Sequence, residues 1–460
     1  MEKTNIQQKR SWQEVLKTVK TLDPQKLEII KATLPIVKDH GEAITKQFYK
    51  RMFKQHPELL NIFNQTHQLT GHQPKALADA VYGAAANIED FSKIMPVLER
   101  IGEKHRSLQI KPEHYPIVGE NLLGAIKEVL GDAATNEIID AWADAYEVIS
   151  DVFIRMENRM YKTTETLPGG WAGFREFKVD KKVEESDVIT SFYLKPKDGN
   201  QITAFIPGQY ITLKVEIPGE KYTHLRQYSL SDSPGLDYYR ISVKREDSRE
   251  QEIPAGIVSS YLHTHVNEGD ILPITAPAGD FYLDMESTLP LVLISGGVGL
   301  TPMMCMLNTT VKNIPKREIY FIHAAINSHY HAFKTHVNDL AAEHKNVKSF
   351  VVYEKPTDED REMKNFDGEG YLNLDQMQQI VPTKDADFYF CGPEPFMKVV
   401  NKSLKDWEFQ RNEFIMNFSG RLVAWNKVKI TTLKKSAWLF MWVHLMELVR
   451  LTNSSFFKSS

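Results

Sequence analysis

A glycine-rich turn stands between a strand-like run of aliphatic residues and a helical pattern. It reads GGVGLTP (296–302), follows LVLIS and precedes MMCMLNTTV. Glycine lets the backbone approach a diphosphate closely, and the N-terminus of a helix offers free N–H groups and a favourable dipole. A later strand-like run ends in a second turn, CGPEP (391–395). Either turn alone also fits an ordinary strand–helix connection, but together they predict a dinucleotide site.

Arginine and tyrosine cluster in a second pair of motifs. RQYS contains Arg226 and Tyr228, and PGQY upstream ends in Tyr210. An arginine can pair with a phosphate through two parallel hydrogen bonds, and tyrosines can lie against an extended ring system. GIVSSYL, which begins at Gly256, supplies a glycine followed by hydroxyls at a predicted helix start. The alternative is a tyrosine-rich strand edge, which the motifs alone do not exclude.

One of the 15 histidines, His105, ends a predicted helix, and it has polar residues suited to hold it. Tyr115 begins the next helix and Glu157 falls late in the last one. A histidine that binds haem iron needs a partner on its second ring nitrogen, which fixes the tautomer and raises the basicity of the ligand. A tyrosine and a carboxylate fit that need. A satisfied core histidine is the alternative.

Four upstream residues are candidates for the other side of such a pocket. They are Tyr49, Phe63, Gln73 and Leu77. Gln73 and Leu77 are four positions apart, so they would share one face of a helix. Core aromatics and a surface glutamine are the alternative, and spacing alone does not decide.

The elements that carry these residues change twice along the chain. Residues 22–163 show apolar positions at helical spacing and predict an all-α domain. Residues 164–275 show short β-branched runs between turn signals, which predict an antiparallel barrel or sandwich. Residues 276–414 alternate strand and helix, as in a parallel sheet flanked by helices. Residues 1–21 and 415–460 are predicted to be an N-terminal extension and a divergent tail.

Composition sets further limits. The 460 residues suggest about three domains, since a domain has roughly 150 residues. The net charge of −4 gives no reason to expect a nucleic-acid partner. Two cysteines exclude a disulfide scaffold and any site made of four thiolates. Because the N-terminus also lacks a secretory apolar segment, we expect a protein of the cytoplasm.

Five motifs in order resemble the ferredoxin–NADP reductase superfamily. They are RQYS, GxVSxxL, PAGDF, GGVGLTP and YFCGP, spread over roughly 200 residues. The resemblance implies an antiparallel β-barrel domain that binds FAD and an α/β domain with a parallel sheet that binds a nicotinamide dinucleotide. The flavin contacts it implies are Tyr210, Arg226, Gln227, Tyr228, Ser229, Gly256, Val258 and Ser259. The dinucleotide contacts it implies are Gly297, Val298, Gly299, Leu300, Thr301, Pro302, Cys391, Gly392 and Pro393.

With the helical domain in front, residues 22–412 resemble the flavohaemoglobins. The shared patterns are QFYKRMF, NIFN, HQPKAL, EKHRSLQIKPEHY and GGW. The resemblance implies that His105 ligates the iron of haem b, with Tyr115 and Glu157 behind it. It also implies the roles of five further residues: Tyr49, Gln73 and Leu77 line the distal side, Phe63 wedges the haem and Lys104 influences electron entry.

The resemblance further implies a nitric oxide dioxygenase. Electrons would pass from NAD(P)H through FAD to haem, where NO and O2 give nitrate. NADH is favoured over NADPH because AINSHYHAF, after the second strand of the parallel sheet, has no arginine for a 2′-phosphate. The alternatives are a reductase of hydroperoxides, ferric iron or quinones, and an O2 or NO sensor with an impaired reductase half. We expect a monomer.

The C-terminal end departs from the family. Where relatives have a motif like YEFFGP, this chain has MNFSGR, with Asn417, Ser419 and Arg421 at the changed positions. Segment 436–451 is apolar but shorter than the ~20 residues of a spanning helix. A contact with the membrane interface and a segment docked on the protein are two readings. We favour a third, a shifted reading frame or an unspliced intron, and expect no membrane contact.

Overall fold

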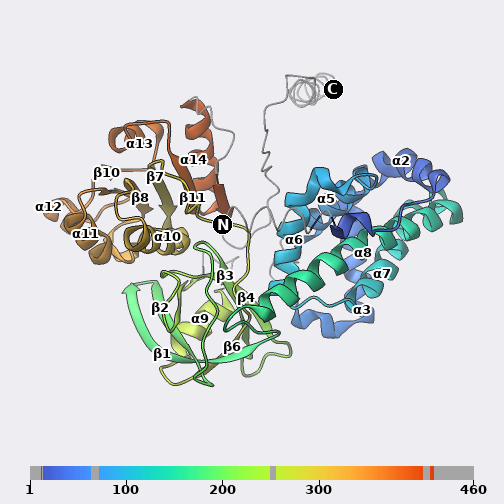
Figure 1. Ribbon diagram of the computed structural model, residues 1–460, viewed down its shortest axis with the longest axis horizontal. Helices are drawn as coiled ribbons and strands as arrows, with labels where there is room; N and C mark the ends of the chain where they lie inside the picture. Colours follow the sequence, from blue (N-terminus) through green and yellow to red (C-terminus); the bar gives the residue numbers. More distant parts are fainter. Residues whose placement is uncertain (1–11, 13, 64–71, 249–254, 408–414, 419–460) are drawn as a thin grey trace, which may run out of the picture. The chain divides into compact units, whose positions relative to one another are not determined.

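The computed structural model describes residues 12, 14–63, 72–248, 255–407 and 415–418 (Figure 1). Along the chain, these residues form a helical region, an antiparallel β region and a parallel α/β region. This is the order of fold types that the sequence predicts. Each region has apolar cores built mainly from its own elements.

The helical region consists of long α-helices joined by short 3-10 turns. They are α2 (Pro24–Asp39), α3 (Gly41–Gln55), η1 (Pro57–Asn61), α5 (His72–Ala86), η2 (Phe91–Ile94), α6 (Met95–Ser107), α7 (His114–Leu130), η3 (Gly131–Ala133) and α8 (Asn136–Thr166). Local signals set the ends: the side chain of Asp23 caps the first N–H groups of α2, and Thr135 caps α8. Helix α3 packs on α5 and α7, and α6 packs on α8.

Part of the N-terminal extension belongs to a core of the helical region. Trp12 is only 4% exposed and lies in one apolar cluster with Phe153, Met156 and Met160. Burying an aromatic side chain of this size is strongly favourable. This packing partner of α8 is not evident from the sequence, where residues 1–21 stand apart from the helical pattern.

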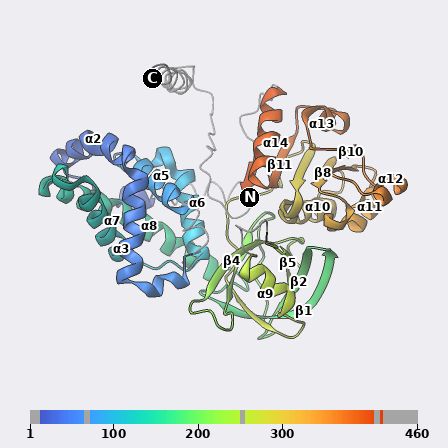
Figure 2. The same ribbon diagram turned by 180° about the vertical axis from the view of Figure 1, so that it is seen from behind.

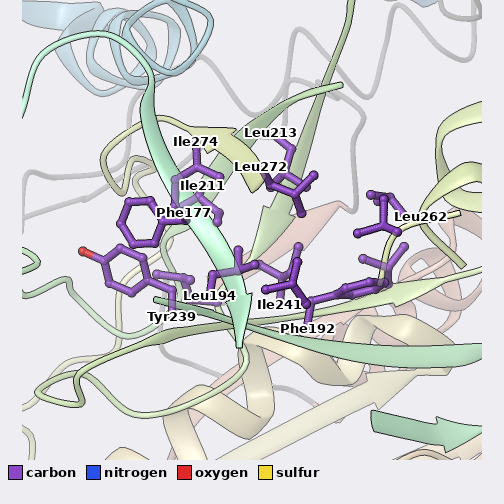
Figure 3. Packing of buried hydrophobic residues seen from close by; sticks show 14 of the residues in the cluster. Phe177, Phe192, Leu194, Ile211, Leu213, Tyr239, Ile241, Leu262, Leu272 and Ile274 are labelled. Carbon is purple, nitrogen blue, oxygen red and sulfur yellow. The ribbon is translucent and has the colours of Figure 1, made fainter. Parts of the chain in front are cut away.

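The antiparallel region closes into a barrel. Its strands are β1 (Arg175–Ser186), β2 (Ile189–Pro196), β3 (Tyr210–Val215), β4 (His224–Ser229), β5 (Tyr239–Lys244) and β6 (Ile271–Ile274), with α9 (Ile257–Thr264) beside them. The strand order is β4-β3-β6-β1-β2-β5, and a bridge from Leu230, directly after β4, to Ile241 of β5 joins the two ends. Inward side chains such as Phe177 and Phe192 fill the interior (Figure 3). The strand pattern alone fits a barrel or a sandwich and the resemblance implies a barrel, which this bridge supports.

The third region is a parallel sheet. Its strands are β7 (Leu291–Gly296), β8 (Ile319–Ala325), β9 (Val347–Tyr353), β10 (Gly368–Glu369), β11 (Asp387–Gly392) and β12 (Ile415–Phe418). Its helices are α10 (Leu300–Asn313), α11 (Lys334–Glu343), α12 (Asp358–Met363), α13 (Leu374–Ile380) and α14 (Glu394–Asp406), with the 3-10 turns η4 (Gly297–Gly299) and η5 (Ser328–Tyr330). The order β10-β9-β8-β7-β11-β12 is parallel throughout.

Both faces of this sheet are covered, which explains its unbroken apolar strands. Leu291 and Leu293 of β7 pack in one cluster with residues of α10 and α11. Val292 and Ile294, which point the other way, pack in a second cluster with residues of α13 and α14. Figure 2 shows the same layers from behind. The strand order reverses between β7 and β11, because the chain leaves β7 for β8 and later returns to the other side of β7.

Residues 415–418, at the start of the divergent tail, form a regular strand of the parallel sheet. Strand β12 pairs in parallel with β11, so that Asn417 lies opposite Cys391 and Phe418 opposite Gly392. Ser419, Arg421 and segment 436–451 lie outside the described residues. Of the helices that the structure does describe, none has the length and apolar character needed to cross a bilayer.

Candidate functional site

The helical region brings His105 together with both of its expected partners. His105 lies in the last turn of α6, Tyr115 in the first turn of α7 and Glu157 deep in α8. Nδ1 of His105 lies 2.7 Å from Oε1 of Glu157 and 3.2 Å from the hydroxyl of Tyr115. The Tyr115 hydroxyl donates to the same carboxylate oxygen over 2.6 Å. Three residues up to 52 positions apart therefore form one hydrogen-bonded group.

This arrangement fixes the position of one ring proton of the imidazole. A carboxylate only accepts, so Nδ1 of His105 must be the donor toward Glu157, and the tautomer of the neutral ring then has its lone pair on Nε2. Glu157 is 3% exposed, so its charge sits in a dry environment where both hydrogen bonds are strong. Burial, and then the nearby Glu157, raise the pKa of Tyr115, which stays protonated as a donor.

Neighbouring residues hold Tyr115 in place. The hydroxyl of Tyr146 donates to the backbone carbonyl of Tyr115 over 2.7 Å. The ring of Tyr146 passes so close to Gly119 that a Cβ there would lie 2.6 Å from a ring carbon. Glycine at this point of α7 is therefore needed for the close approach.

The distal candidates come from α3, from the segment just after η1 and from α5. The buried ring of Tyr49 stacks on Phe53 at 5.7 Å and meets Phe63 edge-on at 5.8 Å between centroids. Leu77 packs against the same core cluster. Gln73 lies on α5, but its side chain is outside the described residues.

These residues fit a haem. In the part of the chain that the structure describes, no hydrogen bond engages Nε2 of His105, the atom that would meet iron. Phe153 lies beside the imidazole, 5.8 Å between ring centroids, and provides an apolar neighbour. Lys104 stands next to His105 on α6, and burial lowers its pKa to about 8.

The flavin candidates line two paired strands of the barrel. Tyr210 begins β3 directly opposite Ser229 of β4, and Ile211 lies opposite Tyr228. Side chains alternate along a strand, so Arg226 and Tyr228 share one face of β4 while Gln227 and Ser229 share the other. The registered pair of strands therefore brings PGQY and RQYS together, as the sequence leads one to expect.

Arg226 is a cation without a counter-ion among the described residues. Its one hydrogen bond there runs from Nη1 to the carbonyl of Leu225 over 2.9 Å. Desolvation lowers its pKa, yet a guanidinium stays charged in proteins. A partly buried charge of this kind is costly unless an anion pairs with it. The residue thus fits the phosphate of a flavin nucleotide.

The GIVSSYL segment forms the start of α9, with Gly256 as its N-cap. A Cβ on Gly256 would lie 2.7 Å from the hydroxyl oxygen of Ser259. That hydroxyl donates to the Gly256 carbonyl and accepts from the N–H of Glu246. Val258 is buried in the barrel core. The hydroxyl of Ser259 therefore supports the turn before α9.

The two glycine turns meet at the point where the sheet order reverses. Gly297 has a left-handed backbone, φ +53°, and a Cβ on Gly299 would overlap the carbonyl oxygen of Cys391. A Cβ on Gly392 would meet the ring of Phe396 at 2.5 Å. In open parallel sheets, ligands bind at the carboxyl ends of the strands at such a reversal. The turn at Gly297–Gly299 leads straight into α10, whose N-terminus suits a diphosphate.

The remaining dinucleotide candidates have structural roles in these turns. Leu300 is buried under the sheet, and the hydroxyl of Thr301 donates to the carbonyl of Val298 over 3.1 Å. Pro302 is also buried, in the first turn of α10. Pro393 precedes α14 as its N-cap residue.

The sequence did not reveal one further cluster at this edge. Ser295, His323, His331 and Tyr353 form a buried polar group at the ends of β7, β8 and β9. Each residue alone is unremarkable in the sequence. The signal in the sequence was a histidine, His323, within a strand whose other residues are apolar, and a second histidine, His331, after the turn η5.

Comparison with known proteins covers all three regions. Residues 46–153 match the globin family, residues 176–282 the oxidoreductase FAD-binding domain and residues 293–402 the oxidoreductase NAD-binding domain. A flavohemoprotein of Halalkalibacterium halodurans is 55% identical over 400 residues, 87% of this chain and 97% of that protein. The flavohemoprotein of Bacillus subtilis is 53% identical over 385 residues, 84% of this chain and 94% of that one.

A solved structure of a flavohemoglobin is similar to this chain as well. The crystal structure of a flavohemoglobin from Malassezia yamatoensis, with bound FAD and haem, superimposes with a TM-score of 0.74 at 25% identity. The match covers 87% of this chain and 100% of that one. It extends over the globin and both reductase regions together.

Proposed function

Since this chain belongs to the flavohaemoprotein family, an oxidoreductase family with haem, FAD and a nicotinamide dinucleotide as cofactors, we propose that it works as a nitric oxide dioxygenase. In this reaction one NO, one O2 and one electron give one nitrate. A hydride carries two electrons, so each NAD(P)H serves two turnovers. The cofactors supply hydride transfer, single-electron transfer and O2 chemistry, and the protein supplies placement and electronic tuning.

The observation that carries this proposal is the His105–Glu157–Tyr115 group. A carboxylate on Nδ1 makes the imidazole a more basic ligand, which pushes electron density toward the iron. The hydrogen bonds of 2.7 Å and 2.6 Å onto one oxygen of Glu157 support the role of His105 as iron ligand.

On the distal side of the haem pocket, we propose that Tyr49 would donate a hydrogen bond to the O2 substrate. Gln73 and Leu77 would shape the same side, and Phe63 would wedge the haem. The burial of Tyr49 and its ring contacts with Phe63 support this assignment. Lys104, next to the iron ligand, would influence the entry of electrons.

For the reductase half we propose that Arg226 pairs with a phosphate of FAD and that Tyr210 and Tyr228 flank the flavin. The uncompensated guanidinium supports the first role. Gly297 to Pro302 and Cys391 to Pro393 would hold the dinucleotide where the sheet order reverses. NADH is the favoured donor, because AINSHYHAF offers no arginine.

We also propose domain limits, assembly and location. The domains would span 22–163, 164–275 and 276–414. The chain would act as a monomer in the cytoplasm, which agrees with its two free, buried cysteines. NO and O2 are its small-molecule partners, and nucleic acid is not one.

One observation supports a second candidate function. Asn417 replaces the acidic residue of the family motif, and this change is the basis for an O2 or NO sensor with an impaired reductase half. The regular pairing of β12 with β11 speaks against gross loss of that half, because the backbone at Asn417 retains a place in the sheet.

Steady-state NO consumption under air tests the proposal. Full-length protein loaded with haem and FAD should consume NO with NADH and form nitrate in equal amount. His105→Ala should abolish this activity. Protein with both cofactors that consumes no NO, yet binds O2 reversibly, would favour the sensor instead. Turnover of hydroperoxides or ferric iron in place of NO would favour the reductase alternative.

A further inference from the structure

A continuous line of buried polar side chains crosses three strands of the parallel sheet. The hydroxyl of Ser295 lies 2.8 Å from Nδ1 of His323, and the rings of His323 and His331 stand 4.6 Å apart between centroids. Nδ1 of His331 lies 3.0 Å from the hydroxyl of Tyr353. Ser295, His323 and Tyr353 have no exposure at all, and His331 is 5% exposed.

Burying these polar side chains costs free energy. Nε2 of His323 is buried with no hydrogen-bond partner among the described residues. A buried polar atom without a partner costs free energy, and an apolar side chain of similar size would avoid that cost. Desolvation lowers the pKa of His323 to about 4 and that of His331 well below its usual value, so both rings are neutral at pH 7. Neutral rings can each offer one donor and one acceptor, as the two hydroxyl contacts require.

The line ends at the turn proposed to hold the dinucleotide. Ser295 pairs in register with His323 and directly precedes Gly296, where the glycine turn starts. A Cβ on Gly296 would lie 2.9 Å from the ring of Phe396, so the backbone there has little room to shift. The hydrogen bond between Ser295 and His323 therefore adds a side-chain link between the end of β7 and the neighbouring strand β8, which the backbone pairing already holds in register.

The other end of the line fixes the loop after β8. His331 precedes Phe333, whose backbone is left-handed with φ +58°, a rare conformation for a bulky residue. Such a conformation persists only where the surroundings determine it strongly, and it gathers at functional sites. The bond from His331 to Tyr353 at the end of β9 is one such determinant. The loops after β7 and β8, which border the proposed site, are thus tied through two histidines.

We propose that His323 and His331 are positioning residues for the nicotinamide dinucleotide. Through Ser295 and Tyr353 they hold the glycine turn and the loop after β8 in the shape that receives the cofactor, without touching it. This inference rests on the proposed function, because it takes the edge formed by these turns to be the dinucleotide site. It predicts that the hydrogen-bonding atom of His323 matters, and not only the volume of its ring.

Anaerobic flavin reduction at varied NADH concentration tests this, because it separates the apparent dissociation constant of NADH from the limiting rate. Ser295→Ala and His323→Leu should each raise the dissociation constant about 5- to 10-fold, the effect of one lost hydrogen bond, with the limiting rate within about twofold. His323→Asn places an amide near the position of Nδ1 and should stay within about twofold of the parent. The double variant Ser295→Ala/His323→Leu should be no worse than either single change.

Controls keep the result interpretable. His344→Asn changes a half-buried histidine at the end of α11 and should leave both constants unchanged. Tyr353→Phe removes one hydroxyl at the far end and should give a smaller rise, so the proposal does not depend on a variant that fails to fold. FAD content and the spectrum of haem reduced by dithionite should match the parent throughout.

Parental affinity for NADH in both Ser295→Ala and His323→Leu would overturn the proposal. Equal losses in His323→Asn and His323→Leu, or additive losses in the double variant, would do the same, because they mean that the ring only fills space. A parent protein whose flavin is not reduced by NADH at any concentration would instead refute the proposed function.

Discussion

Replacing Glu157 by glutamine should weaken oxygen chemistry while the haem stays bound. The change keeps the shape of the side chain and removes its charge. In the parent protein one carboxylate oxygen of Glu157 accepts from Nδ1 of His105 over 2.7 Å and from the Tyr115 hydroxyl over 2.6 Å. The Glu157 side chain is only 3% exposed. A hydrogen bond to a buried charge is worth about 1.5–3 kcal/mol, against ~1 kcal/mol for a neutral one. If that difference of about 0.5–2 kcal/mol appears in the transition state, NO turnover falls roughly 2- to 30-fold, which overlaps the loss of about 10- to 100-fold seen when hydrogen-bond partners of other metal ligands are removed.

Two further variants provide a comparison for Glu157→Gln. Tyr115→Phe removes a neutral donor and leaves the carboxylate on His105, so turnover should fall by less than in Glu157→Gln. Glu147→Gln lies on the same helix but changes a surface carboxylate paired with Lys20, and it should behave like the parent. The assay is NO consumption under air, normalised to haem, with the iron–histidine stretching frequency as a direct report on ligand basicity. Parental turnover and an unchanged frequency in Glu157→Gln would refute the reasoning.

Four other outcomes follow from the structure. His105→Ala should lose stable haem and keep FAD, and a normal haem content in that variant would refute the ligand assignment. Arg226→Ala should weaken FAD binding roughly 10- to 100-fold while haem remains, as titration with limiting FAD would measure. Gly299→Ala should abolish flavin reduction by NADH, because its Cβ would overlap the backbone at Cys391. His323 is neutral when folded, with a pKa of about 4 against 6.5 when unfolded, so the unfolded chain binds more protons between these values. The free energy of unfolding should therefore fall by up to about 3 kcal/mol as pH drops from 6.5 to 4, and His323→Asn should lose much of that dependence in denaturant titrations.

Much of the site could be predicted because helical spacing and ordered motifs are local properties. The periodicity placed His105 near the end of one helix and Tyr115 at the start of the next, and the structure confirms both positions. The contact with Glu157 needed the resemblance, since nothing in the spacing determines how α8 packs on α6. The alternation of strand and helix after residue 276 was enough to predict the parallel sheet.

The features that could not be predicted are contacts between elements that lie far apart in the sequence. Ser295 and His323 lie 28 positions apart and meet only because β7 and β8 pair in one register. The strand pattern did not show how the barrel closes, because the bridge from Leu230 to Ile241 joins segments that are not adjacent in the strand order. Trp12 showed no pattern of its own, because its packing partners lie far along the chain on α8. In each case the residue can be read from the sequence, but its contact partner in the folded protein cannot.

Anaerobic mixing of the full-length, cofactor-loaded protein with NADH tests the central claim most directly. The flavin and haem absorption bands are followed in the same experiment. We expect the flavin to be reduced first and the haem iron next, because electrons must pass from the reductase half to His105 and its haem. Flavin reduction without haem reduction, or no flavin reduction at all, would contradict the account that this chain, with Asn417 in its altered C-terminal strand, is a working dioxygenase.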